Sequence, residues 1–324
     1  MKKPIAMAAV LALAAAMLTG CGGGGAKPKT YKVGVSIYKF DDNFMTLYRE
    51  EIERYFESLE SDTVKYDVTV MDGKGDMVEQ TENVEYFIAN KVDVMIINLV
   101  QSSSASTITQ MCKEAGIPCV YINREPSIED MKQWDKICYV AAERYQSSKC
   151  MGEIIRDLPD NGDADGDGVV RYVMLVGDPE SSLRLFDLIG STIKALTDAG
   201  IVVEKLFEQR GDWDTAKGQE LTTNALAQFG AMVDVVFAQN DGMALGALQA
   251  IKAAGRNVGE DIYLVGMDAI PEAVEAVKAG DMTGTVLNDH ATQARAAVNA
   301  TLVYLAGGTI APPYLRVDYV KITN

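Results

Sequence analysis

The sequence is short of histidine, of paired cysteines and of basic residues. Its only histidine is His290, and none of its five cysteines belongs to a Cys-x-x-Cys pair. A zinc site is therefore not expected, because such sites use closely spaced Cys and His ligands. The 30 basic residues face 46 acidic ones, a net charge of −16. This sign excludes nucleic acid as the expected partner, because a phosphate backbone would be repelled.

The apolar run near the N-terminus, Ile5 to Leu18, is too short to cross a bilayer comfortably. It follows two lysines, as in a signal peptide. The next residues, Leu18 to Cys21, resemble a bacterial lipobox, which implies cleavage before Cys21 and lipidation of its thiol. We expect residues 1–20 to be a signal peptide, residues 21–30 to be a lipidated tether, and the product to be a lipoprotein on the outer face of the cytoplasmic membrane. A plain signal peptide with a chance cysteine is the alternative.

The remaining composition is that of a globular protein, with 48% apolar and 23% charged residues in 324. That length suggests about two domains. Export permits disulfides, but the sequence alone pairs none of the other cysteines. We expect these to be structural or incidental; they are Cys112, Cys119, Cys138 and Cys150.

Short β-branched or aromatic runs alternate with amphipathic segments along the whole chain after Thr30. This alternation predicts buried parallel strands joined by helical crossovers. Two series of such runs predict two doubly wound α/β lobes that join near Tyr139 to Ala142. The predicted strands are Val33–Ile37, Tyr66–Val70, Val92–Ile97, Ile117–Ile122, Ile137–Val140, Val170–Val176, Val202–Phe207, Val233–Ala238, Ile262–Gly266 and Gly284–Leu287.

Polar residues follow many of these strands, at the edge where ligands bind in open α/β sheets. Carboxylates and amides there can bond hydroxyl groups, and aromatic rings can cover the C–H faces of a sugar. Helix capping is the alternative for each Asp or Asn, and burial in the core is the alternative for Trp213. The candidates are Tyr38, Asp42, Phe44, Asn123, Trp213, Asn240, Asp268 and Asn288.

Taken in order, seven segments resemble the bacterial periplasmic glucose/galactose-binding proteins, over roughly Tyr31 to Val320. They are Ile37–Met45, Ile97–Val100, Asn123–Ser127, Trp213–Ala216, Asn240–Ala244, Asp268–Glu272 and Gly284–Asp289. The resemblance implies a type I periplasmic binding protein fold, with a three-stranded hinge between lobes of residues 31–139 plus 289–316 and of residues 142–287 plus 318–324. It also implies a monosaccharide ligand and an ABC importer permease as partner, with a chemoreceptor as a further possibility.

The same resemblance implies roles for the candidate residues. Phe44 and Trp213 would sandwich the pyranose ring, and Asp42 would accept a hydrogen bond from the sugar. Asn123, Asn240, Asp268 and Asn288 would add polar contacts, with Tyr38 at the edge. Where the family has His, Asp and Arg after the first strand of the second lobe, this chain has Ser182, Arg184 and Leu188, or Asp187 if the register shifts by one. We expect this exchange to change ligand preference; local divergence on a surface helix is the alternative.

Residues 163–171 resemble the family's calcium loop. Alternating acids can turn their oxygens onto one hard cation, so Asp163, Asp165, Asp167, the Val169 carbonyl and Asp234 are the candidate ligands. However, Arg171 replaces a family Gln ligand, Asp234 replaces a longer Glu, and an arginine cannot accept a hydrogen bond or coordinate a cation. Calcium binding and replacement of the cation by Arg171 are the two alternatives.

No nucleophile and base constellation is present, so an enzyme is not expected, although Asp42 and Asp268 could in principle act as acid and base on a sugar. No organic cofactor is expected. We expect a monomer that feeds an importer; a sensor that delivers its ligand state to a receptor would use the same surface.

Overall fold

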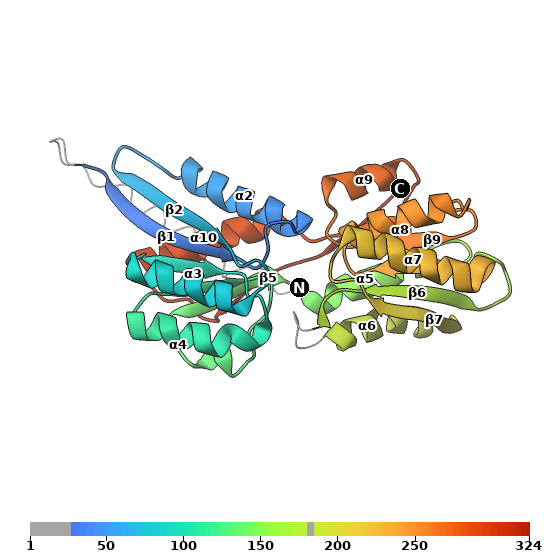
Figure 1. The fold of residues 1–324 in the computed structure, drawn as a ribbon, viewed down its shortest axis with the longest axis horizontal. Coiled ribbons are helices and arrows are strands. Elements are labelled where there is room, and N and C mark those ends of the chain that lie inside the picture. The colour runs from blue at the N-terminus through green and yellow to red at the C-terminus, as the bar shows by residue number, and fades with distance from the viewer. Residues whose placement is uncertain (1–26, 180–184) are drawn as a thin grey trace. The chain divides into compact units, whose positions relative to one another are not determined.

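The computed structural model describes residues 27–179 and 185–324 of the chain. These form two compact units, the first lobe (27–41, 45–141 and 290–317) and the second lobe (42–44, 142–289 and 318–324). Each lobe contains one six-stranded sheet with helices on both faces (Figure 1). The predicted fold class of two parallel-sheet α/β lobes is confirmed. The signal peptide, Cys21, Ser182 and Arg184 lie outside the described residues.

The sheet of the first lobe begins with the apolar strand β1, which pairs in parallel with β2 on one side and with β3 on the other. Further parallel pairs join β3 to β4 and β4 to β5. Across the sheet the strands are β11 (Tyr314–Val317), β5 (Ile137–Ala142), β4 (Cys119–Ile122), β3 (Val94–Ile97), β1 (Lys29–Ile37) and β2 (Val64–Asp72).

Helices cover both faces of this first sheet. On one face lie α3 (Met77–Ala89) and α4 (Ala105–Ala115), side by side in Figure 1. On the other face α2 (Asn43–Ser58) and α10 (His290–Leu305) are joined by hydrogen bonds. Helix α3 approaches β1 so closely that a Cβ on Gly34 would lie 2.5 Å from Cγ of Phe87. Glycine is therefore required at this point of the buried strand.

The sheet of the second lobe repeats the same plan, with β6 beside β7 and β8. Its closing strand β12 differs from the prediction of parallel pairing, because it runs antiparallel to β10. The order is β12 (Val320–Thr323), β10 (Gly284–Leu287), β9 (Tyr263–Val265), β8 (Val235–Ala238), β6 (Val170–Val176) and β7 (Val203–Arg210).

Among the described residues, five α-helices flank the second sheet. One face carries α5 (Arg144–Arg156) and α6 (Leu185–Thr197), whose apolar residues pack on β6, β8 and β9. The other carries α7 (Thr215–Phe229), α8 (Asp241–Ala253) and α9 (Pro271–Lys278). Strand β7 runs to Arg210, beyond the predicted end at Phe207, because its polar end still pairs with β6 at the sheet edge.

The four described cysteines, expected to be structural or incidental, are buried free thiols. The Sγ of Cys112 lies 3.8 Å from the Sδ of Met95 inside the core of the first lobe. No helix in residues 27–179 or 185–324 is both long and apolar enough to cross a membrane.

Candidate ligand-binding site

All the candidate ligand-binding residues that the structure describes lie at or just after the carboxyl end of a strand or at the start of the next helix. In the first lobe, Tyr38 follows β1 and Asn123 follows β4. Asp42 and Phe44 lie at the start of α2, in the segment 42–44 that is grouped with the second lobe. In the second lobe, Trp213 lies between β7 and α7, while Asn240, Asp268 and Asn288 follow β8, β9 and β10. This is the edge of an open α/β sheet at which ligands bind.

In the first lobe, Tyr38 is held by the two neighbouring strand ends. Its backbone N–H donates to Oδ1 of Asn98, which follows β3, at 3.3 Å. The guanidinium carbon of Arg124, which follows β4, lies 3.6 Å from the centre of the Tyr38 ring. The Arg124 side chain is buried and donates through Nη1 to the carbonyls of Leu99 and Val100. A planar cation stacked on an aromatic ring is favourable, so Arg124 fixes both the ring and the turn after β3.

A network of buried side-chain amides holds the turns that carry Tyr38 and Arg124. Gln80 of α3 accepts a hydrogen bond from the N–H of Val100 at 2.8 Å and donates to the carbonyl of Asn98 at 2.8 Å. Asn98 in turn donates to the carbonyl of Ile122 at 3.3 Å. Buried polar groups need such partners, so the turns after β1, β3 and β4 are held as one unit.

Asn123 adopts a left-handed backbone conformation with φ of 58°, and its carbonyl accepts a hydrogen bond of 2.6 Å from the hydroxyl of Tyr139. Its amide nitrogen lies 3.2 Å from the Sδ of Met45. Asn tolerates this conformation better than most residues. The structure thus gives Asn123 a role in shaping the turn. Phe44, which directly precedes Met45 in the sequence, is a buried ring at the start of α2.

In the second lobe, the indole of Trp213 lies over the backbone of Gly177, the residue after β6. A Cβ on Gly177 would collide with the indole ring. Trp213 has φ of 64°, is half-buried, and packs against the edge of the second lobe's hydrophobic core. Its carbonyl accepts a hydrogen bond of 3.1 Å from Nδ2 of Asn240. The Oδ1 of Asn240 also accepts from the N–H of Met243 at 2.9 Å, so the capping alternative holds for this residue.

Asp268 and Asn288 form a buried pair at the ends of β9 and β10. Nδ2 of Asn288 donates to Oδ1 of Asp268 at 3.1 Å. Asp268 has φ of 113° and does not cap a helix, because the cap of α9 is Ile270. Burial, with a contribution from Asp241, raises the pKa of Asp268 well above its usual value. Backbone strain and a perturbed carboxyl at a strand end are features of functional sites.

Asp241, the first residue of α8, holds the turn that carries Asp268. Its Oδ1 accepts a hydrogen bond of 2.6 Å from the Thr285 hydroxyl, and its Oδ2 accepts one of 2.9 Å from the N–H of Ile270. It is fully buried, and this burial raises its pKa to about 7. Gln239 makes a similar bond, accepting from the N–H of Gly177 at 2.9 Å.

Sequence reasoning missed Arg124 and Asp241 as functional residues. An arginine is usually solvated, so Arg124 gave no signal beyond its position directly after a buried strand. The three residues after β8 are all polar: Gln239, Asn240 and Asp241. Only their contacts in the structure show that Asp241 holds the turn that carries Asp268. Ser182 and Arg184 lie outside the described residues, so the altered segment after β6 remains a prediction from the sequence.

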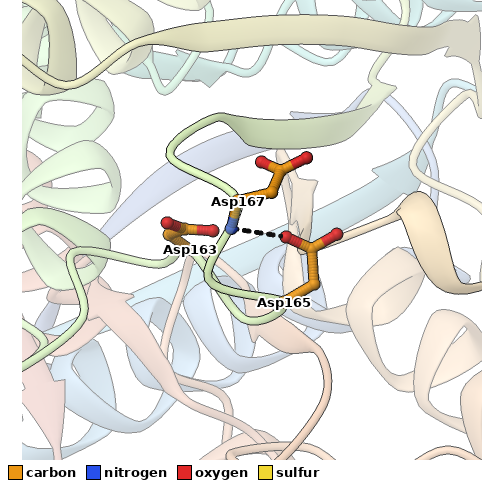
Figure 2. A group of neighbouring side chains, drawn as sticks. All are labelled: Asp163, Asp165 and Asp167. Carbon is orange, nitrogen blue, oxygen red and sulfur yellow. Dashed lines mark hydrogen bonds between the residues drawn. The ribbon is translucent and has the colours of Figure 1, made fainter.

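The candidate calcium ligands lie at the opposite edge of the second sheet, in residues 163–169 before β6, which we call the acidic turn. Carboxylate oxygens of Asp163, Asp165 and Asp167 lie within 4.8 Å of one another (Figure 2). Figure 2 also shows the bond of 3.1 Å from the N–H of Asp167 to Oδ1 of Asp165. Three carboxylates this close repel one another, and a positive charge nearby relieves that repulsion.

That charge is already supplied by Arg171, the second residue of β6. Its Nη1 lies 2.6 Å from Oδ2 of Asp167 and 3.9 Å from Oδ2 of Asp165. The guanidinium lowers the pKa of Asp167. Asp234 is buried, accepts from the N–H of Arg171 through Oδ2 at 2.7 Å, and has no hydrogen-bond partner for Oδ1 among the described residues. With Arg171 in this position, the donor set does not fit a divalent cation, because the guanidinium faces the same oxygens.

Comparison with known proteins agrees with the fold. A family model described as periplasmic binding protein domain matches residues 33–309. The D-galactose/methyl-galactoside binding periplasmic protein MglB of Haemophilus influenzae is 33% identical, over 82% of this chain and 79% of its own. The ribose import binding protein RbsB of the same organism is 26% identical, over 86% and 87%. The structure of an ABC transporter solute binding protein from Bacillus halodurans with bound myo-inositol superposes with a TM-score of 0.78 at 25% identity, covering 93% and 96%.

Proposed function

We propose, given that the chain belongs to the periplasmic binding protein domain family, that it captures a monosaccharide and delivers it to the permease of an ABC importer. In this proposal the protein is exported and one sugar is held by residues of both lobes, so that binding stabilises a closed form. The observation that carries the proposal is the second lobe's strand edge. There a half-buried indole adjoins Asn240, and a buried carboxyl is paired with Asn288.

The chemistry of this edge suits a polyol better than a charged or purely apolar ligand. An indole face packs on the C–H groups of a pyranose, while carboxylate and amide groups accept and donate bonds to its hydroxyls. The same two kinds of group are offered by Tyr38 and Asn123 of the first lobe and by Asp42 and Phe44 at the start of α2. The relatives are solute-binding transport proteins rather than enzymes, and this supports capture without turnover.

Within the sugars, we propose a glucose- or galactose-like ligand, with preference altered by the segment that contains Ser182 and Arg184. The similarity to MglB supports a hexose. The similarity to proteins named for ribose import and solved with myo-inositol shows that this fold accepts several polyols. A changed preference is thus the second candidate within the same function.

Tryptophan fluorescence tests this proposal sharply, because the chain has two tryptophans, Trp213 and Trp134. We expect glucose or galactose to change the emission of the Trp134→Phe variant and not that of Trp213→Phe. Truncation in Trp213→Ala should weaken binding by about 30-fold, or about 2 kcal/mol, as for a buried aromatic contact. The matched control is Trp134→Ala, which should bind as the unsubstituted protein does.

A thermal-shift panel identifies the ligand, because a compound that binds only the folded protein raises its melting temperature. Hexoses, pentoses, inositol and purine nucleosides form the panel. Silence of every sugar would contradict the proposed function. A response to another polyol with none to glucose or galactose would assign the altered preference to this chain, and Arg184→Ala would then test the segment responsible.

We further propose that the lipid on Cys21 holds the protein beside its permease. The support is the agreement in position between the signal peptide and Leu18–Cys21. Cys21→Ser should release the protein from the membrane fraction, whereas Cys150→Ser, which removes a buried thiol, should not. Membrane retention of the Cys21→Ser variant would contradict lipid anchoring.

A further inference from the structure

We propose that Arg171 serves as the built-in cation of the acidic turn, so that this turn is closed without calcium and a single substitution opens it to the metal. This inference concerns the edge of the second sheet opposite to the candidate ligand residues and is independent of which sugar is bound. It rests on the position of one guanidinium, on the partners of the acidic oxygens and on the strands that fix Arg171.

The guanidinium of Arg171 faces two of the three acids directly. Nη1 lies 2.6 Å from Oδ2 of Asp167 and 3.9 Å from Oδ2 of Asp165. On its other side Nε donates to Oε2 of Glu204 at 3.1 Å, and 15% of the side chain is exposed. A largely buried arginine between several carboxylates is a fixed positive charge, since it does not lose its proton.

The other carboxylate oxygens of the turn are occupied by its own backbone. Asp163 accepts from the N–H groups of Gly166 at 3.0 Å and Gly168 at 2.9 Å. Oδ1 of Asp165 accepts from Asp167, and Oδ1 of Asp167 accepts from Val169 at 3.0 Å. The two oxygens without such a backbone bond, Oδ2 of Asp165 and Oδ2 of Asp167, are the ones that face Arg171.

The backbone of Arg171 is fixed by two neighbouring strands. Arg171 of β6 is in register with Glu204 of β7, the residue its side chain contacts. Its N–H donates to Oδ2 of Asp234 at 2.7 Å, and its carbonyl accepts from the N–H of Asp234 at 2.9 Å. A calcium ion at the turn would have to displace the guanidinium from both Asp167 and Glu204, and the two positive charges would repel each other.

An amide at position 171 would reverse this balance. It would remove the competing positive charge and leave the Oδ2 atoms of Asp165 and Asp167 free to bind a metal ion. It would also offer a neutral carbonyl oxygen of the kind that calcium binds. The Val169 carbonyl completes an oxygen set typical of calcium.

The test is calcium titration by calorimetry, with terbium luminescence as a second readout, on chelator-treated protein. The unsubstituted protein should show no calcium uptake up to about 1 mM, the weak limit for such modules. Arg171→Gln should bind calcium at least about 10-fold more tightly than that limit, and calcium should raise its melting temperature. The control Arg156→Gln removes ion pairs to Glu153 and Asp157 in the same lobe and should behave as the unsubstituted protein.

Two results would overturn the proposal. One is calcium uptake by the unsubstituted protein with a Kd below about 1 mM, a measurement that needs no variant to fold. The other is a folded Arg171→Gln variant that takes up no calcium. If this variant unfolds in chelator, recovery of its thermal transition on addition of calcium supports the proposal, and failure to recover while Arg171→Lys remains folded without metal contradicts the calcium part of it.

Discussion

The two lobes share one strand plan but place opposite charges at their carboxyl edges. In each sheet the first strand lies between the second and the third, and a late strand closes the far edge. The buried charge at the edge of the first lobe is Arg124, whereas the edge of the second holds the buried carboxyls of Asp241 and Asp268. The same backbone architecture therefore carries two different electrostatic solutions, and the side chains at the turns rather than the fold decide what each lobe can bind.

The two charges also stabilise their turns differently. Arg124 is a donor that binds carbonyl oxygens and covers the ring of Tyr38. Asp241 is an acceptor that binds the hydroxyl of Thr285 and the N–H of Ile270. Removing either leaves buried partners unpaired, but only Asp241 changes its charge near neutral pH, because burial raises its pKa to about 7.

The largest effect is expected from Asp241→Ala in the second lobe. It leaves the Thr285 hydroxyl and the Ile270 N–H without an acceptor inside the protein, and each such loss costs roughly 1–3 kcal/mol. We expect the free energy of unfolding to fall by about 3 kcal/mol, measured by urea denaturation. The matched control is Asp198→Ala, whose carboxylate pairs with Lys194 on the surface and should change stability by less than about 0.5 kcal/mol. Equal losses of unfolding free energy in the two variants would show that Asp241 does not stabilise the turns of the second lobe.

The sequence predicts the strands and the sheet edge that carries the candidate site. The reason is that short apolar runs alternating with amphipathic helices can be buried in few ways other than a parallel sheet covered by helices. Val33–Ile37 and Val170–Val176 lie within or coincide with β1 and β6. Polar residues directly after these runs lie at strand ends for the same reason. The boundaries of β7 and the antiparallel β12 could not be predicted, because both depend on pairing with strands distant in sequence.

The contacts that hold the turns could not be predicted from residue type. Arg124 is buried only because the carbonyls of Leu99 and Val100 and the ring of Tyr38 come from other strand ends. Asn240 caps α8 and also donates to Trp213, two roles that the sequence offered as alternatives. For Arg171, the spacing indicated that it could pair with the acids, and the structure shows the ion pair with Asp167.

An intermediate effect is expected from Arg124→Lys in the first lobe. Lysine keeps the positive charge but loses the planar stack on Tyr38 and the fork that reaches two carbonyls. We expect sugar affinity to fall about 10-fold, or about 1.4 kcal/mol, with a smaller change in the melting temperature of the free protein. Titration calorimetry and a thermal scan separate these effects.

The control for this variant is Arg49→Lys. The guanidinium of Arg49 also lies over a ring, 4.1 Å from the centre of Phe40, but Phe40 is not a candidate ligand residue. Sugar affinity should therefore stay unchanged in Arg49→Lys. Unchanged sugar affinity in Arg124→Lys would show that a positive charge alone is enough to hold the turns of the first lobe. The two lobes would then differ only in the sign of the ionisable group at this edge.

The smallest effect is expected from pH, and its sign differs between the lobes. In the first lobe, hydrogen bonding to Arg54, with Arg295 adding to it, lowers the pKa of Glu51 to about 2. This carboxylate stabilises the folded state above its ordinary pKa near 4.5, and the contribution is lost as the pH falls toward 2. Asp241 has a raised pKa, so its contribution increases as the pH falls from about 7 toward 4.

Urea denaturation at a series of pH values, in paired variants, separates the two contributions. Because Glu51 forms its ion pairs with arginines that are exposed to solvent, Glu51→Gln should lower the free energy of unfolding by less than about 1 kcal/mol at pH 6. This loss should vanish near pH 2. Asp241→Asn should instead flatten the dependence between pH 4 and 7, since the amide does not titrate. A stability difference between the unsubstituted protein and Asp241→Asn that rises with pH across that window would contradict the assignment, because a buried acid that binds its proton in the folded state must give the opposite slope.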